Sequence, residues 1–488
     1  MIRRSFRVFL AAAVLPLMMA AAAPPAQAAV FIPTKLTDSA DGACDSDCSL
    51  REAVLAANAA AGSDFIVLGV GTYDLTLFGA SEDLGLSGDL DVRDDLAIVG
   101  ESASSTVIDA NQLDRIFDVL AGFRLELVGL TVTNGLVVSE KGGGLRVAGE
   151  LSLRRGIVCD NRAGNGGGIA GVGSNSVLDL DQSTVLENRS TSQGGGIHFE
   201  NTLQLVNSTV ALNVAELNGG GGIYATDDAV GTVSNSTIAF NTALSGTGGG
   251  VLVASVPFIS ADHPVFSNSI LAANSAPSER DCSGAALSAG HNLLGDGSGC
   301  LDFGNHPGDL EGTAATPLNP QLLALNAAGG PTPAYQPAAG SPAIDHGSGC
   351  EPVDQRGAAR PPACDIGSVE VTGECISGGP ILCLNQSRFQ VKVVWDTGSE
   401  IGSGQGVKLT DESGFFTFFD PSNVELTVKI LNACNLGGKY WVFMSGLTNV
   451  GVTVTVTDTQ TGQVKTYNNP RNRTFVPVLD TSAFATCP

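Results

Sequence analysis

The chain has 488 residues, of which 49 are acidic and 25 are basic, so its formal net charge is −24 at neutral pH. This acidity disfavours nucleic acid as a partner, because lysine and arginine supply most of the affinity for phosphates. The length exceeds that of a typical single domain, and we expect more than one.

The N-terminus is typical of an export signal. Arg3, Arg4 and Arg7 precede an apolar run from Val8 to Ala23, and Ala26-Gln-Ala28 forms a cleavage motif. We therefore predict a signal peptide over residues 1–28 and a secreted or cell-surface mature chain, whose net charge becomes −27 once those three arginines are removed. These residues are compatible both with a general export signal that has a basic N-terminus and with a twin-arginine signal. No later stretch is apolar for about 18 residues, so we expect no transmembrane segment in the mature chain.

Residues 29–65 combine a short cysteine loop with an alanine-rich segment. Cys44 and Cys48 flank the loop, and the helix expected after it places Ala53, Val54 and Ala57 on one face. The open end of a stack of strands exposes unpaired edges and apolar core, which must be covered. We predict that this segment is the N-terminal cap of the repeats that follow.

The segment Cys48-Ser-Leu-Arg-Glu-Ala53 matches the CSLREA segment found on many exported bacterial proteins, and the chain resembles that family here. The match covers six residues and is specific. It implies a parallel β-helix in an exported bacterial protein.

Residues 66–315 carry two markers that share one period. Five glycine runs stand directly before an aliphatic residue, and these aliphatic positions are 24, 28, 26 and 28 residues apart. The runs contain Gly142, Gly166, Gly194, Gly220 and Gly248. Asparagines recur at separations of 27, 27, 25 and 28, namely Asn134, Asn161, Asn188, Asn213 and Asn241. Periods of this size indicate stacked supersecondary units.

Each unit has room for two or three short strands but for no helix of ordinary length. β-Branched segments precede the asparagines, and Val185, Val210 and Ile238 are expected to stack in the core. The asparagines would form a ladder, and the glycines would allow positive φ at the corners. We predict a right-handed parallel β-helix. A flexible glycine-rich linker would not keep both markers in register.

Residues 316–374 are rich in proline and contain Asp345, Asp354, Arg356 and Asp365. The order of Ser341-Pro-Ala-Ile-Asp345, Asp354-Gln-Arg-Gly357 and Cys364-Asp-Ile-Gly367 resembles the closing segment of the same exported proteins, called a choice-of-anchor domain. We interpret the charged residues as an ion-paired network in a C-terminal cap. A catalytic carboxylate pair is the weaker alternative.

Residues 375–488 differ in sequence pattern from the repeats. They contain seven or eight segments in which apolar and polar residues alternate, joined by short turns. Examples are Phe389–Trp395, Val424–Ile430 and Val452–Val456. This pattern predicts an antiparallel β-sandwich. The fold class is therefore all-β, with a parallel β-helix followed by a small sandwich. Through Phe418-Phe-Asp-Pro-Ser-Asn-Val-Glu-Leu426 and Tyr440-Trp-Val-Phe443, the module also resembles an uncharacterised C-terminal module of secreted bacterial proteins, which implies no chemistry.

The eleven cysteines favour disulfides in an exported chain. Close spacing predicts the pairs Cys44–Cys48, Cys282–Cys300 and Cys350–Cys364. The pairing of the last four stays open: Cys375, Cys383, Cys434 and Cys487. Cys159 is left over and aligns with Leu186 of the next repeat, so we interpret it as a packed free thiol.

Parallel β-helices commonly carry polysaccharide lyases or glycoside hydrolases, although fold alone does not establish activity. A hydrolase needs two positioned carboxylates, and a lyase for acidic sugars needs calcium carboxylates beside an arginine or lysine base. The acidic candidates all coincide with expected turns, where aspartate binds the backbone: Asp89, Asp91, Asp94, Asp95, Asp227 and Asp228. The histidines show no metal-ligand spacing.

These observations lead us to predict no catalytic residue, no cofactor-binding residue and no metal ligand; acidic loops could at most bind calcium weakly. The predicted function is that of a non-enzymatic adhesion, binding or envelope-structural protein, with polysaccharide or another surface macromolecule as partner. The repeats partly resemble those of polymorphic outer-membrane adhesins at Phe240 and Asn241. The alternative is a polysaccharide lyase or glycoside hydrolase, which carboxylates converging in a groove beside an arginine would favour.

Overall fold

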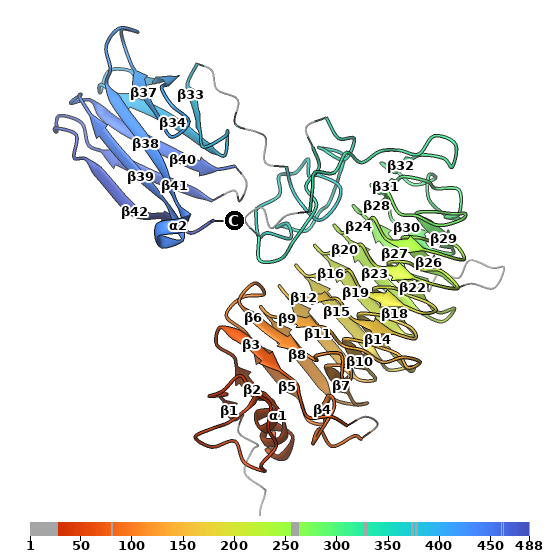
Figure 1. The fold of residues 1–488 in the computed structure, drawn as a ribbon. Coiled ribbons are helices and arrows are strands. Elements are labelled where there is room, and N and C mark those ends of the chain that lie inside the picture. Colours follow the sequence, from red (N-terminus) through yellow and green to blue (C-terminus); the bar gives the residue numbers. More distant parts are fainter. Residues whose placement is uncertain are drawn as a thin grey trace, which may run out of the picture.

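The computed structural model is almost entirely β-structure and contains a parallel β-helix followed by two antiparallel sheets (Figure 1). This confirms the predicted fold class. The structure describes residues 28–79, 82–254, 263–325, 330–338, 340–371, 375, 379–459, 461 and 463–487. The predicted signal peptide lies outside these residues, apart from residue 28.

The N-terminal segment covers the first coils of the β-helix. Helix α1 (Leu50–Ala59) begins at Ser49, whose side chain accepts the Glu52 amide while the Glu52 carboxylate accepts the Ser49 amide. Ala53, Val54 and Ala57 are buried in the core, on the predicted inward face. Arg51 is fully buried: it pairs with Asp38 at 2.8 Å and donates to the carbonyl oxygens of Gly85, Gly88 and Asp89.

Four parallel sheets run along the β-helix, and we number them 1 to 4. Sheet 1 contains, in spatial order, β1 (Val30–Phe31), β2 (Asp64–Val67), β5 (Leu96–Val99), β8 (Arg124–Val128), β11 (Glu150–Arg154), β15 (Val177–Asp181), β19 (Thr202–Val206), β23 (Val230–Ser234), β27 (Val265–Ser267) and β30 (Leu287–Ser288). Sheet 2 contains β4 (Leu90–Val92), β7 (Phe117–Val119), β10 (Leu145–Val147), β14 (Ile169–Gly171), β18 (Ile197–Phe199), β22 (Ile223–Ala225), β26 (Val251–Val253) and β29 (Cys282–Gly284).

Sheets 3 and 4 complete each coil. Sheet 3 contains β3 (Gly71–Asp74), β6 (Thr106–Asp109), β9 (Thr131–Thr133), β12 (Ile157–Cys159), β16 (Thr184–Leu186), β20 (Thr209–Ala211), β24 (Thr237–Ala239), β28 (Ile270–Ala272), β31 (Leu293–Leu294) and β32 (Leu310–Glu311). Sheet 4 contains β13 (Arg162–Ala163), β17 (Arg189–Ser190), β21 (Val214–Ala215) and β25 (Thr242–Ala243). Val185, Val210 and Ile238 are register partners and stack in the core.

A ladder of buried asparagines links consecutive coils. From Asn188 onward, each side-chain Oδ1 accepts the backbone N–H of the asparagine one coil earlier, at 2.9–3.1 Å, and also accepts a hydrogen bond from its side-chain Nδ2, at 2.9–3.0 Å. The rungs are Asn161, Asn188, Asn213, Asn241 and Asn274. Asp281 ends the ladder by accepting both donors of Asn274 at 2.9 Å.

The structure corrects the first predicted rung. Thr133 pairs with Cys159, so Gly135 rather than Asn134 occupies the rung position beside Asn161. Asn134 has φ of 59° and donates to the Asp109 carboxylate at 2.9 Å. Its spacing of 27 residues matched the repeat although it lies one residue early in its coil.

The glycine runs form the corners that lead into sheet 2. The five glycines named from the sequence have φ between 60° and 74°: Gly142, Gly166, Gly194, Gly220 and Gly248. A Cβ on Gly194 would lie 2.4 Å from the carbonyl oxygen of Ile197. These corners therefore require glycine both for backbone conformation and for space.

Residues 330–371, which we call the strap, lie along the outer face of sheet 3 rather than only across the end of the β-helix (Figure 1). Gln355 is fully buried; it accepts from the Thr209 hydroxyl at 2.7 Å and donates to the Thr184 hydroxyl at 3.0 Å. Ser368 donates its amide to the Thr237 hydroxyl at 3.0 Å. The expected C-terminal cap is therefore largely a flank cover, because hydroxyls in a row on sheet 3 offer it hydrogen bonds.

The charged residues named in the strap do form a network. Arg356 pairs with Asp354 at 2.8 Å, and the Asp345 amide donates to Asp365 at 2.8 Å. Glu370 joins them, because its amide donates to Asp354 at 3.0 Å. These contacts bind the strap to itself. The ion pairs and hydrogen bonds are those expected of a network that stabilises the strap.

The C-terminal module consists of two antiparallel sheets with one shared apolar core. One sheet contains β33 (Ile381–Leu384), β34 (Phe389–Asp396), β35 (Ile401–Ser403), β40 (Gly451–Asp458) and β41 (Val464–Asn469). The other contains β36 (Gln405–Lys408), β37 (Ser413–Thr417), β38 (Leu426–Ala433), β39 (Lys439–Gly446) and β42 (Val478–Phe484), with the short α2 (Cys434–Gly437) between β38 and β39.

Five disulfides join Cys44–Cys48, Cys282–Cys300, Cys350–Cys364, Cys375–Cys383 and Cys434–Cys487. The last two pairs resolve the pairing that the sequence left open. Cys159 is a free thiol on β12, in register with Leu186, and burial raises its pKa to about 12.

Candidate functional site

The candidate site begins with a row of polar side chains on the outer face of sheet 2. In β4, Leu90 and Val92 point into the core, so Asp91 between them points outward. Asp91 is the register partner of Asp118 on β7, and Asp118 is the partner of Arg146 on β10. Parallel pairing thus places these three side chains side by side on consecutive coils.

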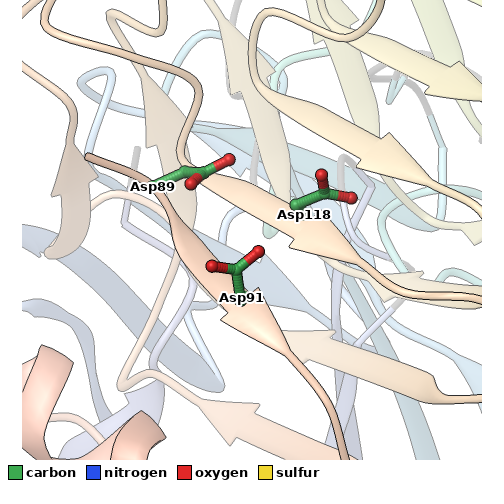
Figure 2. A group of neighbouring side chains, drawn as sticks. All are labelled: Asp89, Asp91 and Asp118. Carbon is green, nitrogen blue, oxygen red and sulfur yellow. The ribbon is translucent and has the colours of Figure 1, made fainter. Parts of the chain in front are cut away.

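Three carboxylates converge at the start of this row (Figure 2). One oxygen from each of Asp89, Asp91 and Asp118 lies within 4.8 Å of the other two. All three residues are buried, with exposed fractions of 6%, 0% and 5%. Neither oxygen of Asp91 makes a hydrogen bond. Burying a carboxylate without a partner is unfavourable, which makes this group unusual in the molecule.

Two arginines contact the group from its outer side. Arg146 pairs with Asp118 at 2.7 Å. Arg115 lies 3.3 Å from Asp118, 3.5 Å from Asp89 and in contact with Glu140. Asp118 is therefore bound by two arginines and Asp89 by one, whereas Asp91 contacts neither.

A cavity of about 490 Å³ opens beside the carboxylates. Its wall contains acidic groups, two arginines and an apolar rim that comes mainly from the loop after β9. The lining residues are Glu82, Asp83, Asp89, Leu113, Asp114, Arg115, Asp118, Leu136, Val137, Val138, Ser139, Glu140 and Arg146. This volume falls in the range of small-ligand sites. Donors and acceptors that converge on one concave space can bind a polar ligand.

Burial and mutual repulsion alter the acidity of these groups. Burial, together with the neighbouring Asp114 and Asp91 charges, raises the pKa of Asp89 to about 8. Burial and the Asp118 charge raise the pKa of Asp91 to about 7. Burial alone would lower the pKa of Arg115, but the surrounding carboxylates outweigh it and raise that pKa.

The structure separates the acidic residues that the sequence grouped as turn aspartates. Asp94 accepts the Asp95 amide at 2.9 Å, and Asp95 accepts the Arg124 amide at 3.0 Å, as turn residues do. Asp227 and Asp228 lie exposed in the turn between β22 and β23. The turn interpretation is wrong for Asp91, which lies within strand β4. Asp89 ends the bend before that strand, but its side chain is buried and lies 3.5 Å from Arg115.

Sequence reasoning missed Asp118, Arg115 and Arg146. One signal was present: Leu90-Asp-Val92 and Phe117-Asp-Val119 place an aspartate between two core residues, 27 residues apart. That separation is the period of the repeat, so the two aspartates occupy the same place on neighbouring coils.

His198 lies further along the same face of sheet 2 and does not join the site. Its ring stacks on Tyr224 with centroids 5.2 Å apart, and it lies 3.5 Å from Glu200. Its side chain is buried, with 3% exposed. Among the residues that the structure describes, the three aspartates are the one group spaced to hold a metal ion.

No protein-family model, curated protein or solved structure matches the chain. Within the described ranges, no helix combines the length and apolar character needed to cross a bilayer.

Proposed function

We propose that this protein is an exported polysaccharide-binding protein, and that the cavity beside Asp89, Asp118, Arg115 and Arg146 holds a segment of the glycan. The observation that carries the proposal is the convergence of carboxylates and guanidinium groups on one cavity of about 490 Å³. Sugar hydroxyls both donate and accept hydrogen bonds, so a wall with both kinds of partner suits them.

Export is supported by several independent features. Five disulfides are typical of chains that fold in an oxidising compartment. The first residues have the composition of a signal peptide, and Cys48–Ala53 resembles the CSLREA segment of exported bacterial proteins. The strap resembles a choice-of-anchor segment, which fits attachment at a cell surface.

The geometry favours binding over cleavage by a lyase or by an inverting hydrolase. The base of a lyase must be unprotonated before it can accept a proton from the sugar. The carboxylates around Arg115 raise its pKa and so stabilise the protonated form. An inverting hydrolase keeps its two carboxyl groups about 6.5–9.5 Å apart to admit water. Here the carboxylate oxygens crowd within 4.8 Å, and Asp91 is fully buried.

A glycoside hydrolase is the second candidate, because one observation favours it. The raised pKa of Asp89, about 8, would keep this group protonated at neutral pH, as a general acid requires. Asp118 faces the same cavity and is bound by two arginines. This pair meets the condition that carboxylates converge beside an arginine.

Binding and turnover can be measured on the same purified protein. Pectins, alginates, glycosaminoglycans and neutral glucans would be offered, and binding measured by calorimetry. Reducing ends and unsaturated-product absorbance would report cleavage. Arg146→Ala should weaken glycan binding at least tenfold, because Arg146 lines the cavity. The control Arg473→Ala removes an exposed arginine of the C-terminal module.

The outcomes separate the two candidates. Saturable binding without product, weakened only by Arg146→Ala, supports a binding protein. Sustained turnover that Asp89→Asn abolishes would replace this proposal with the hydrolase. Absence of binding to every glycan offered, or equal binding by Arg146→Ala and Arg473→Ala, would contradict a glycan site in this cavity.

A further inference from the structure

We propose that Asp89, Asp91 and Asp118 bind a divalent cation, and we assign it to Ca²⁺. The proposal concerns the floor of the candidate site and goes beyond glycan binding, on which it does not depend. It also goes beyond weak association of cations with acidic loops, because the three ligands are buried and come from strand β4, the residue before it and strand β7.

The β-helix fixes the three carboxylates at cation-binding distances. Asp89 and Asp91 are two residues apart and share one face, and Asp118 is the register partner of Asp91 on the next coil. Their oxygens lie within 4.8 Å of one another. Two oxygens on opposite sides of Ca²⁺ are about 5 Å apart, because each Ca–O distance is about 2.3–2.6 Å. One ion can therefore contact all three groups without a change in the backbone.

The state of Asp91 is independent support for an ion. The residue is fully buried, neither carboxylate oxygen makes a hydrogen bond, and neither arginine contacts it. Figure 2 shows the three carboxyl groups around one common space, with Asp91 reaching it from β4 and Asp118 from β7. A buried carboxylate is normally paired or coordinates a metal. The arginines already occupy the outer side of Asp118, so a cation in this space would complete the pairing of Asp91.

The donor set favours Ca²⁺. All three ligands are carboxylate oxygens, which suit hard cations, and the group contains no histidine or cysteine for zinc or copper. Mg²⁺ requires near-ideal octahedral distances, with opposite ligands about 4.2 Å apart. Ca²⁺ tolerates the less regular geometry of side chains fixed on strands. The adjacent cavity gives water access to its remaining coordination positions.

The test uses the purified protein after treatment with EDTA and dialysis, titrated with CaCl₂ in a calorimeter without any glycan. We expect one saturable site, with a Kd on the order of 10⁻⁴ M, and a rise in the melting temperature when Ca²⁺ is added. Asp91→Asn should weaken Ca²⁺ binding at least tenfold and remove this rise. In EDTA the same variant should melt no lower than the wild type, because an amide replaces an unpaired buried carboxylate.

Asp228→Asn is the matched control, because it makes the same chemical change at an exposed turn, and it should keep the full response. Absence of saturable Ca²⁺ binding, or unchanged binding by Asp91→Asn, would overturn the site. Tighter binding of Mg²⁺ than of Ca²⁺ would overturn the assignment. Loss of glycan binding with intact Ca²⁺ binding would affect only the proposed function, and the converse only this inference.

Discussion

Asp91 and Asp118 are paired on neighbouring parallel strands, so the spacing of the coils holds two buried carboxylates side by side. In most of the β-helix the same pairing stacks apolar or small side chains, which stabilise the fold. At this position it stacks like charges. The local arrangement is therefore unfavourable for folding unless arginines or another cation compensate, which is why we propose a function for this pair.

The asparagine ladder should contribute strongly to stability. Asn213 is fully buried, accepts two donors from Asn188 and donates to the carbonyl oxygen of Val185 at 2.9 Å. Asn213→Ala leaves these groups unpaired, so we expect unfolding free energy to fall by about 3 kcal/mol. Chemical denaturation would measure it. Asn175→Ala, at an exposed asparagine whose φ is not positive, should change it by less than about 0.5 kcal/mol.

The glycine corners should not tolerate a side chain. Gly194→Ala combines φ of 62° with a Cβ only 2.4 Å from the Ile197 carbonyl oxygen, so we expect a loss of at least about 3 kcal/mol. Gly173→Ala is the control, because φ is 79° but nothing lies within 4 Å of its Cβ. It should lose only about 1 kcal/mol. Equal losses in the two variants, measured by thermal unfolding, would show that crowding is unimportant.

Attachment of the strap should depend on Gln355. Its side chain contacts the hydroxyls of Thr184 and Thr209, and both contacts are buried. Gln355→Ala should increase hydrogen exchange and protease cleavage in residues 340–371 while the asparagine ladder stays protected, since the strap is only a cover. Gln386→Ala, at an exposed glutamine of the C-terminal module, should leave the strap unchanged. A loss of protection throughout the β-helix would contradict a covering role.

Asp281 should make the protein less stable as pH rises from about 4 to 6. Burial raises its pKa in the folded state to about 6 from the ordinary 3.8. Across this window the folded state binds the proton more tightly than the unfolded chain, so unfolding free energy falls with pH by up to about 3 kcal/mol. Denaturation series at several pH values would measure the slope. Asp281→Asn should flatten the slope between pH 4 and 6, and an unchanged slope would exclude this group as its source.

Cys159 should be chemically inert in the folded protein. Burial raises the pKa of its thiol to about 12, so the reactive thiolate is rare at pH 8. Alkylation by iodoacetamide, followed by mass spectrometry, should be roughly a thousandfold slower than in the unfolded chain. Rapid modification of the native protein would instead indicate an accessible, activated thiol.

The repeat architecture was predictable because its markers serve the backbone of every coil. Glycines at positive φ and asparagines in the ladder recur at each turn, so their period is visible in one sequence. Asn134 was wrongly assigned to the ladder because the spacing of asparagines cannot resolve a shift of one residue. The pairing of Thr133 with Cys159 shows this shift.

The candidate site was less visible for a physical reason. Strand β4 has three residues, which is too short to show alternation, so Asp89 and Asp91 resembled turn aspartates. The position of the strap along sheet 3 was not predicted either, because its contacts join residues more than a hundred positions apart, such as Thr209 and Gln355. Neither local propensity nor period carries that information.

The strap also limits how many coils the β-helix can have in the region that it contacts. It contacts Thr184, Thr209 and Thr237 on three successive coils, and Ser348 reaches Asn268 beside the next. Inserting or deleting one coil within this span would shift every later contact by about 4.8 Å. The number of repeats is therefore fixed between β16 and β28, whereas the coils from β7 to β14 lie outside these strap contacts. Duplication of repeats, a common route by which solenoids lengthen, is compatible with this fold in that earlier stretch.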